Sequence, residues 1–402
     1  MSLKIENVTL YTGKGEKLSQ SALVIEGNKI TAIGEEAAAK NAATVIDGRG
    51  KTILPGFFDM HIHLGMDGIA DPFAQIATDS QATSAYRHQA NAQKQLESGV
   101  TSVRNLGSKW HIDLAYRDAV NSGLLAGPTV YGSGQPIVMT GGHGYPLATE
   151  ADGEDEIRKA ARQTLKQGAD VLKLMATGGV MTPGVDPGSP QLSEKEMRAA
   201  VEEALHAGKT TASHAQGTAG IQNAVRAGIT TIEHGIFLDD ETIELMIQYG
   251  TVLVPTLAAP YYIVKNADSG AIPPHAVKKA AYCYEVHGES FRKAVEAGVK
   301  IAAGTDAGTP FNLHGDFAKE LELMHEGGMN VRDIIASATY SAASVLNVQN
   351  ETGSLEKGKI ADFIMLNEDP EENISAFRAV KAVYKGGELV HESLGKETNS
   401  AT

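Results

Sequence analysis

The sequence contains a single cysteine, Cys283, and few aromatic residues, which make up 5% of its 402 positions. One cysteine allows neither an intramolecular disulfide nor a cluster of thiolate ligands around a metal. No apolar run approaches the roughly 18 residues that a membrane-spanning helix needs, and Met1–Glu6 lacks the basic segment and apolar run of a secretory signal. We therefore expect a cytoplasmic protein without a membrane partner.

Positive charge is also scarce, because the sequence has 35 lysines and arginines but 49 aspartates and glutamates, which gives a formal net charge of −14. Binding to nucleic acid depends on positive charge, so we expect a small-molecule substrate and no nucleic-acid partner. Hydrophobic residues make up 42% of the chain and charged residues 21%, which is the composition of an ordinary globular protein.

Short apolar runs alternate with longer helix-like segments between about Pro55 and Val348. Several of these segments end in a glycine just before the next run, as at Gly99 and Gly298, which is typical of a helix C-cap. Eight runs that each lead into a helix predict a (β/α)8 TIM barrel, an α/β fold whose catalytic groups lie at the carboxyl ends of the strands. The runs are Phe57–Leu64, Thr101–Leu106, Thr129–Ser133, Val171–Ala176, Thr210–His214, Thr230–His234, Val252–Leu257 and Lys300–Thr305.

Both ends of the chain carry short β-like runs separated by turns. Near the C-terminus, Val380–Lys385 is followed by Gly386-Gly387, which is a hairpin signal. We expect residues 1–55 plus 355–402 to form one small β-sandwich domain, with the barrel domain at residues 56–354 between them. The last residues, Glu397–Thr402, are polar, and we expect them to be frayed.

Residues that can bind metals fall at or near the ends of the predicted strands. Taken singly, each has an ordinary explanation, since a lone histidine there is usually a hydrogen-bonded core residue and Asp306 could cap the next segment. Lys173 is harder to explain, because a lysine in a buried apolar strand is costly unless it is paired or modified. Together they converge on one barrel mouth and predict a metal site. The converging residues are His61, His63, Lys173, His214, His234 and Asp306.

These residues lie in motifs that resemble the amidohydrolase superfamily, binuclear-metal type. The motifs are Asp59-Met-His61-Ile-His63, Lys173, His214, Glu233-His234-Gly235 and Gly304-Thr305-Asp306-Ala307-Gly308. Three more segments resemble the prolidase-like branch, which contains Xaa-Pro dipeptidases and is related to imidazolonepropionase. These segments are Thr101–Gly107, Gly141–Gly144 and Ala176–Gly179. The resemblance covers nearly the whole chain.

The resemblance implies how the ligands would be shared. His61, His63 and Asp306 would hold one divalent metal ion, with zinc favoured by the ligand set, and His214 and His234 would hold a second. Lys173, carboxylated on its amine by carbon dioxide, would bridge the two ions, which would share a hydroxide that attacks an amide carbonyl. Asp306 would accept the hydroxide proton and deliver it to the leaving amine as the general acid.

Substrate contacts are expected from residues that follow other runs. His143, in a glycine-rich turn, would donate to the tetrahedral oxyanion or to a substrate carboxylate. Arg104 ends the second run and either binds that carboxylate bidentately or pairs with an acid at the barrel mouth. Gln216 lies where dipeptidase-like relatives carry an aromatic residue, which questions a specificity for proline. The remaining candidates for substrate contacts are Tyr145, Tyr261, Tyr262 and His314.

We predict a metal-dependent hydrolase that cleaves the amide bond of a small carboxylate-bearing substrate, either a dipeptide such as Xaa-Pro or an N-acyl amino acid, and that forms a homo-oligomer. The alternative is a detoxifying or cyclic-amide hydrolase that acts on a carbamate, lactam or phosphotriester. A mononuclear imidazolonepropionase is disfavoured because Lys173 would have no role in it. A non-catalytic assembly protein is the remote alternative, since such a protein should have lost ligands and none is missing.

Overall fold

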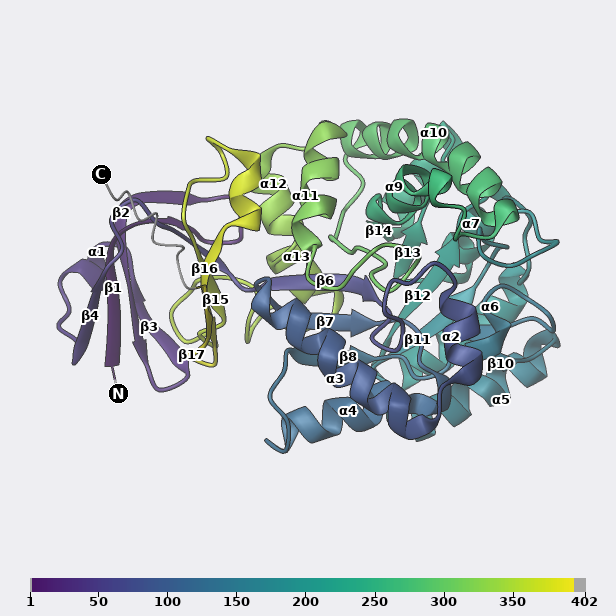
Figure 1. Ribbon diagram of the computed structural model, residues 1–402, viewed down its shortest axis with the longest axis horizontal. Coiled ribbons are helices and arrows are strands. Elements are labelled where there is room, and N and C mark those ends of the chain that lie inside the picture. Colours follow the sequence, from purple (N-terminus) through teal and green to yellow (C-terminus); the bar gives the residue numbers. More distant parts are fainter. Residues whose placement is uncertain (1, 394–402) are drawn as a thin grey trace.

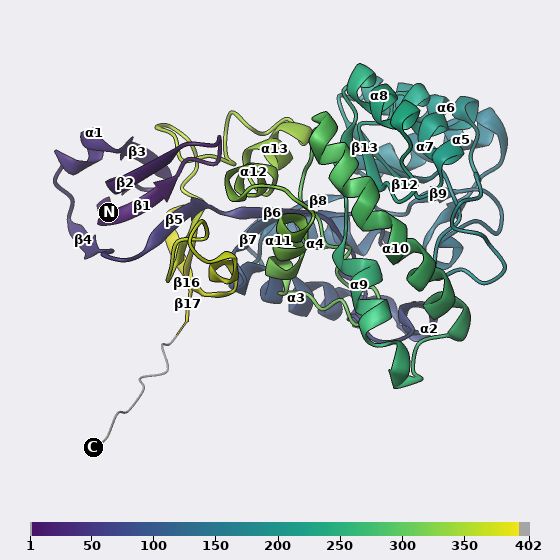
Figure 2. The same cartoon turned by 90° about the horizontal axis from the view of Figure 1, so that it is seen from above.

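The structure, a computed structural model, describes residues 2–393. It is a mixed α/β molecule in which one largely antiparallel sheet lies beside a larger part built of parallel strands and helices (Figure 1). The strand β6 (Phe57–Ile62) leads from that sheet into the larger part, as the view from above in Figure 2 makes clear. The segment Glu397–Thr402, which we expect to be frayed, lies outside the described residues.

Strands from both ends of the chain share the antiparallel-rich sheet. β5 pairs antiparallel with β15, which places Ile53 opposite Met365, and pairs in parallel with β1. The short segment before β15 also reaches β3, because Ile30 N donates to Lys359 O at 2.9 Å. Along the order β17-β16-β15-β5-β1-β2-β3, with β4 beside β1, the strands are β1 (Ser2–Tyr11), β2 (Lys17–Glu26), β3 (Lys29–Ile33), β4 (Thr44–Asp47), β5 (Thr52–Pro55), β15 (Phe363–Leu366), β16 (Val380–Lys385) and β17 (Glu388–Glu392).

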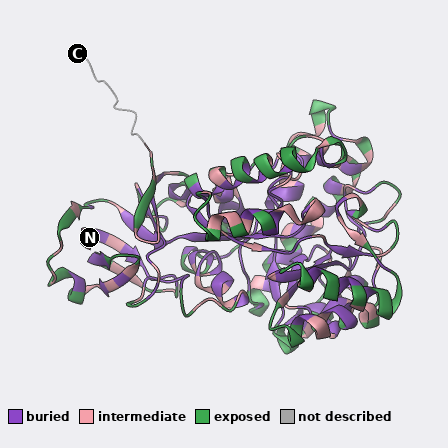
Figure 3. Ribbon diagram, turned by 90° about the horizontal axis from the view of Figure 1, so that it is seen from below, coloured by how far each residue is buried: buried purple, intermediate pink, exposed green. Residues whose placement is uncertain are grey.

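Two sheets of parallel strands form the centre of the larger part. One has the order β6-β7-β8 and the other the order β10-β9-β11-β12-β13-β14. Besides β6, these strands are β7 (Val100–Asn105), β8 (Thr129–Gly132), β9 (Ile137–Val138), β10 (Thr149–Glu150), β11 (Val171–Met175), β12 (Thr210–Ala215), β13 (Thr231–His234) and β14 (Val252–Val254). Every residue of β6, β11 and β14 is buried, as expected for parallel strands covered on both faces (Figure 3).

Backbone hydrogen bonds link the two parallel sheets at both edges. At one edge, Asp170 N donates to Gly132 O at 2.8 Å. At the other, the segment at residues 300–307 lies between β14 and β6, with Leu253 N donating to Lys300 O at 2.8 Å and Met60 N donating to Ala303 O at 2.9 Å. The parallel strands are thus joined side by side from β6 round to the segment that returns to it.

The eighth predicted run, Lys300–Thr305, is not a regular strand, and in this respect the prediction is wrong. Residues in it make only isolated bridge contacts, such as Leu253 with Ile301. Asp306, which follows it, adopts the left-handed conformation with a φ of 60°, so the extended backbone cannot continue through it. Within residues 2–393, the other seven predicted runs all contain strands at the expected positions.

Helices flank the parallel strands, and the expected glycine C-caps are present. α7 and α10 end at Gly228 and Gly298, both in the left-handed conformation that glycine adopts readily. No helix within the described part of the chain is both long and apolar enough to cross a bilayer. The α-helices are α1 (Glu35–Ala38), α2 (Pro72–Thr78), α3 (Gln81–Glu97), α4 (Ile112–Asn121), α5 (Gly153–Lys166), α6 (Glu194–His206), α7 (Thr218–Ala227), α8 (Asp240–Tyr249), α9 (Ala258–Lys265), α10 (Pro274–Ala297), α11 (Phe317–Glu326), α12 (Val331–Ser337) and α13 (Tyr340–Val345).

Candidate active site

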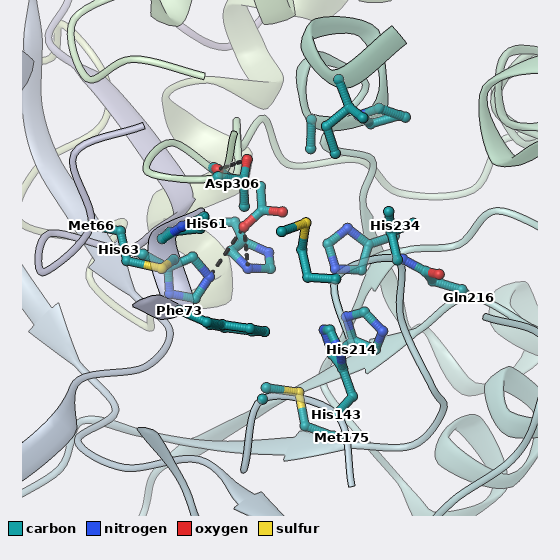
Figure 4. Close-up of a pocket in the computed structure, with 18 of the residues that line it drawn as sticks. His61, His63, Met66, Phe73, His143, Met175, His214, Gln216, His234 and Asp306 are labelled. Carbon is teal, nitrogen blue, oxygen red and sulfur yellow. Dashed lines mark hydrogen bonds and ion pairs between the residues drawn. The ribbon is translucent and has the colours of Figure 1, made fainter. Parts of the chain in front are cut away.

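The predicted metal ligands meet in one cavity at the carboxyl ends of the parallel strands. His61 lies at the end of β6 and His63 directly after it, His214 is the penultimate residue of β12, and His234 is the last residue of β13. Lys173 lies in the middle of β11, and Asp306 follows the segment that returns to β6. Figure 4 shows the histidine rings directed toward the same space, with Asp306 beside His61 and His63.

Hydrogen bonds on one ring nitrogen orient three of these histidines. His61 Nδ1 lies 2.9 Å from Glu233 Oε2, and His214 Nε2 lies 2.9 Å from Gly178 O. Because a carboxylate and a carbonyl only accept, each of these nitrogens carries the proton and the other ring nitrogen keeps its lone pair. The Thr256 hydroxyl donates to Pro255 O at 2.7 Å, so it accepts from His234 Nδ1, which lies 2.6 Å away. Such partners commonly fix the tautomer of metal-binding histidines.

Asp306 and His234 hold unusual backbone conformations for residues other than glycine. Their φ angles are 60° and 75°, and Thr256, the partner of His234, has a φ of 53°. Left-handed backbone is strained for such residues and persists where the surrounding structure enforces it, most often at functional sites. The strain therefore marks this end of the strands independently of the chemistry of the side chains.

Burial keeps the imidazoles in the form that binds metals. Burial lowers the pKa of His61, His214 and His234 well below the ordinary histidine value, and for His61 the nearby Lys173 adds to the effect. Each ring is consequently neutral at pH 7, with a lone pair available for a metal.

Lys173 is buried, and its amine is left without a partner. Its Nζ has no hydrogen-bond partner among the described residues. Burial lowers the pKa of Lys173 to about 8, although the acids Glu233 and Asp306 oppose the shift. About a tenth of the amine is then unprotonated at pH 7, far more than for an ordinary lysine, and the unprotonated form is the one that reacts with carbon dioxide.

The donor set fits a divalent metal ion. Ligand atoms of His61, His234 and Asp306 lie within 4.8 Å of one another, and His63 Nε2 lies 3.1 Å from Asp306 Oδ1. This group contains His61 and Asp306, which the family resemblance assigns to one ion, and His234, which it assigns to the second ion. Imidazole and carboxylate ligands together suit zinc and other first-row metals.

The prediction that Arg104 binds the substrate is wrong. Its side chain has no exposed surface, and its guanidinium donates to Met60 O at 2.7 Å, to Thr231 Oγ1 at 3.0 Å and to Glu233 Oε1 at 2.8 Å. Arg104 is therefore the structural partner of a buried acid, which was the other interpretation of this residue. Glu233 joins it to the metal site, because the second carboxylate oxygen accepts from His61.

Four further candidates for substrate contacts lie away from the cavity. Tyr145 is 50% exposed and does not line the cavity, although its neighbour Gly144 does. The Tyr261 ring lies beneath the ammonium of Lys319, and the Tyr262 hydroxyl donates to Asp316, so neither ring faces the site. His314 is buried, with Nε2 bonded to Met66 O at 2.9 Å. These side chains follow the predicted runs in sequence but point elsewhere.

The cavity that adjoins the ligands is largely apolar. The cavity and its open mouth together contain about 830 Å³ that no protein atom fills. Among the described residues its wall includes no arginine, and its only lysine is Lys173. Polar side chains besides the ligands are His143, Gln216, His287 and Thr309. The apolar wall is formed by Met66, Pro72, Phe73, Leu147, Met175, Val180, Met181, Ile236, Ala259, Pro260 and Ile263.

His143 and Gln216 face this cavity, as expected. The Oε1 atom of Gln216 is buried without a hydrogen-bond partner among the described residues, so the amide is free to bind a ligand group. His287, on α10, was not considered from the sequence. Its Nε2 donates to His234 O at 2.9 Å, and no motif in the sequence distinguishes it from other helical histidines.

The chain belongs to the amidohydrolase family, whose profile matches residues 52–390. It is a hydrolytic enzyme of the prolidase-like branch, as the motifs indicated. A solved Xaa-Pro dipeptidase with methionine bound in its active site is 36% identical, with a TM-score of 0.91 over 98% of this chain and 100% of the other.

Two other relatives are similar over most of their length. Ochratoxinase of Aspergillus niger is 33% identical over 416 residues, which cover 94% of this chain and 85% of the relative. Its solved structure has a TM-score of 0.86, at 32% identity, and covers 96% of this chain and 95% of that chain. Imidazolonepropionase of Bdellovibrio bacteriovorus is 29% identical over 396 residues, which cover 88% of this chain and 84% of the relative.

Proposed function

We propose that this enzyme hydrolyses the amide bond of a small N-acyl amino acid or dipeptide that carries a large apolar side chain. The observation that carries the proposal is the apolar wall around Phe73, Met175 and Ile263, which shares one cavity with the cluster of neutral histidines and Asp306. An apolar group bound against this wall would place the adjoining amide beside the cluster. Ochratoxinase and the Xaa-Pro dipeptidase, the relatives named above, support an amide substrate.

Two divalent ions, zinc by preference, fit the proposed ligands. His61, His63 and Asp306 would hold one ion, His214 and His234 the other, and Lys173 carboxylated by carbon dioxide would contact both. When bound, two such ions polarise a carbonyl and lower the pKa of water, which makes a nucleophile available at neutral pH.

The residues of the chain itself would orient the substrate and move the proton. Asp306 lies 3.1 Å from His63 Nε2 through Oδ1 and would accept a proton from the attacking water, then pass it to the leaving nitrogen. His143 would donate from Nε2 to the carbonyl oxygen or to the substrate carboxylate, and Gln216 would contact the same group. The apolar wall would exclude bulk water and strengthen these polar contacts.

A second candidate is the hydrolysis of an uncharged substrate such as a cyclic amide or a carbamate. One observation favours it: no arginine lines the cavity in the part of the chain that the structure describes, and Arg104 is committed to Glu233. A free carboxylate would then depend on the neutral donors His143, Gln216 and Thr309.

The architecture around the site supports further proposals. The parallel strands and the segment at residues 300–307 would form a closed (β/α)8 TIM barrel at residues 56–354, with residues 1–55 plus 355–402 as a β-sandwich domain. We propose that the enzyme acts on its small-molecule substrate in the cytoplasm as a homo-oligomer.

The test compares N-acetyl-phenylalanine, N-acetyl-methionine, a Leu-Pro dipeptide, an N-acetyl-aspartate control and the carboxamide form of each apolar substrate on metal-loaded enzyme. The proposal expects faster turnover of the apolar acids than of N-acetyl-aspartate. Equal rates for acid and carboxamide would favour the uncharged-substrate candidate, and no hydrolysis of any amide would refute the proposal.

Asp306→Asn should separate proton transfer from metal binding in the same assay. The amide keeps the shape and one oxygen but loses the basic carboxylate, so kcat should fall ~10²–10⁴-fold while KM and metal content change less. An unchanged kcat would assign the proton transfer to another residue.

A further inference from the structure

Residues 177–190 form a loop, the 177–190 loop, that folds back on itself over the cavity. Its two ends pair through a bridge between Thr177 and Pro190, and Gly178 N donates to Ser189 O at 3.0 Å. The return is tight, because a Cβ atom on Gly178 would lie 2.2 Å from Val185 Cγ1. Val180 and Met181, between these ends, belong to the apolar wall. The loop therefore reaches the substrate cavity with a defined conformation.

The ring of His143 lies directly against this loop. A Cβ atom on Gly179 would approach three atoms of the imidazole to between 2.4 and 2.6 Å, so only glycine leaves room for the ring. His143 Nδ1 lies 2.8 Å from Thr182 Oγ1, and His143 N donates to Gln191 Oε1 at 2.9 Å. The ring also lies 4.4 Å from that of His214, measured between centroids (Figure 4). The position of His143 thus depends on contacts with the loop.

The helix α10 holds the same part of the loop. Lys279 Nζ donates to Thr182 O at 2.7 Å and to Gly179 O at 3.4 Å, and His275 Nε2 donates to Met181 O at 3.1 Å. The two carbonyls that Lys279 binds belong to the two residues that contact the His143 ring. Within residues 2–393 the ammonium group of Lys279 forms no ion pair with a carboxylate, and its hydrogen-bond partners are these two carbonyls.

We propose that Thr182 and Lys279 are positioning residues, and that they present His143 to the substrate as the tautomer with its proton on Nε2. In this tautomer the hydroxyl of Thr182 donates its hydrogen to His143 Nδ1 across the 2.8 Å contact, and the ring proton lies on Nε2, the atom available to a substrate oxygen. Lys279 keeps Thr182 and Gly179 at the distance that this contact needs. The inference rests on the proposed function, in which His143 donates a hydrogen bond to the reacting amide or its carboxylate.

The kinetic test uses variants that differ by a single group. Thr182→Val keeps the shape but removes the hydroxyl, and kcat for the best amide substrate should fall about 10- to 100-fold, with a smaller change in KM, because an aligned donor is lost. Thr182→Ser restores the hydroxyl and should restore most of kcat. Gly179→Ala should lower kcat as Thr182→Val does. Gly188→Ala is its control in the same loop, because a Cβ there would meet only Asp186 Oδ1 at 3.4 Å.

Lys279→Met should lower kcat, whereas Lys278→Met, at the exposed neighbouring position on α10, should leave it unchanged. If Thr182→Val, Gly179→Ala and Lys279→Met all keep the wild-type kcat, the inference is wrong. If Thr182→Ser is as slow as Thr182→Val, the hydroxyl is not what positions His143, and the inference is equally wrong.

A second measurement decides the tautomer without any turnover. In protein labelled with ¹³C-histidine, the Cδ2 chemical shift distinguishes the two neutral tautomers, and His143→Gln identifies the signal by its loss. The inference expects the Nε2–H tautomer in the wild type and in Thr182→Ser, and a mixture or the other tautomer in Thr182→Val. An Nδ1–H tautomer in the wild type would overturn the inference even if amides are hydrolysed. If no amide is hydrolysed, the proposed function is wrong, whereas the chemical shift still decides which tautomer His143 adopts.

Discussion

Arg104 and Glu233 form a fully buried ion pair that reaches the metal site without facing the cavity. Both side chains have no exposed surface, and Glu233 also accepts from His61 Nδ1. A buried charge that loses its partner is strongly destabilising, because the remaining charge cannot be solvated. The pair therefore serves the site by holding the His61 ring in one orientation, and its loss should affect stability before specificity.

Arg104→Met should reduce the free energy of unfolding by about 3–5 kcal/mol, since it leaves Glu233 buried and unpaired. The double variant with Glu233→Gln should recover part of that loss. Urea unfolding followed by circular dichroism measures both. Arg104→Met should also change turnover of an N-acyl amino acid and of its carboxamide by the same factor. A selective loss for the free acid would return Arg104 to the role of a carboxylate ligand.

The sequence reveals the ligands of the site better than the substrate contacts. His61, His214 and His234 could be predicted because their places at strand ends follow from the apolar runs alone. The direction of Tyr261 could not, because it depends on the orientation of α9 relative to α11. A carboxylate in a buried strand, as at Glu233, indicates that a buried partner exists. The sequence does not show that this partner is Arg104, because Arg104 lies on another strand and the two side chains meet only in the folded protein.

Two glycines of α10 allow the effect of backbone conformation on stability to be measured apart from the effect of side-chain packing. A Cβ atom would meet nothing within 4 Å at either Gly288, inside the helix, or Gly298, its C-cap. Gly298 has a φ of 82°, whereas no positive φ occurs at Gly288. Substitution at these positions therefore tests the backbone alone.

Gly288→Ala should stabilise the protein by about 0.5–1 kcal/mol, because alanine loses less conformational entropy in a helix. Gly298→Ala should destabilise it by about 1 kcal/mol, because alanine is strained in the left-handed region. Thermal unfolding of both variants gives the comparison. Equal effects of the same sign would show that α10 does not end at Gly298.

The eighth run, Lys300–Thr305, departs from the predicted strand because of its contact with β6. Its composition is that of a buried strand, but Gly304 allows an unusually close approach to β6, where a Cβ atom would lie 2.8 Å from His61 N. The left-handed turn at Asp306 follows two residues later. Such a local departure from strand geometry depends on the neighbouring strand, and the pattern of apolar residues carries no sign of it.

Burial shifts the pKa values of His88 and Glu320 in opposite directions, so the two side chains change the pH dependence of the stability in opposite ways. Burial lowers the pKa of His88 to about 4, and the side chain bonds to Ser84 O at 2.7 Å and to Ser108 Oγ at 3.0 Å. In the unfolded chain the same residue titrates near 6.5. Glu320, whose pKa burial raises to about 8, has the opposite effect, because the folded state keeps its proton to a higher pH.

His88 should therefore contribute a loss of stability as the pH falls from about 6.5 to 4, where the unfolded chain takes up a proton that the folded protein does not. His88→Gln should make the free energy of unfolding less dependent on pH in this window by up to about 1.4 kcal/mol per pH unit. Urea unfolding at several pH values measures the slope. An unchanged slope would mean that His88 takes up its proton at the same pH in the folded protein as in the unfolded chain.

Ion pairs also connect the sheet from the chain ends with the helices beside the parallel strands. Lys17 of β2 pairs with Asp369 and Glu371, and Glu371 pairs with Arg332 of α12 at 2.5 Å. Tyr11 of β1 donates to Asp369 at 2.6 Å. The strand-like runs at the two chain ends predicted one β-sandwich domain, but they carried no indication of these contacts with the helices.

The metal content of the purified protein tests the central claim most directly. Protein expressed with ample zinc and bicarbonate, then analysed for metals per chain, should contain two divalent ions, and Lys173→Ala should contain at most one because the proposed bridging group is gone. A fully active wild type with one ion or fewer, or a Lys173→Ala variant with as many ions as the wild type, would contradict the account.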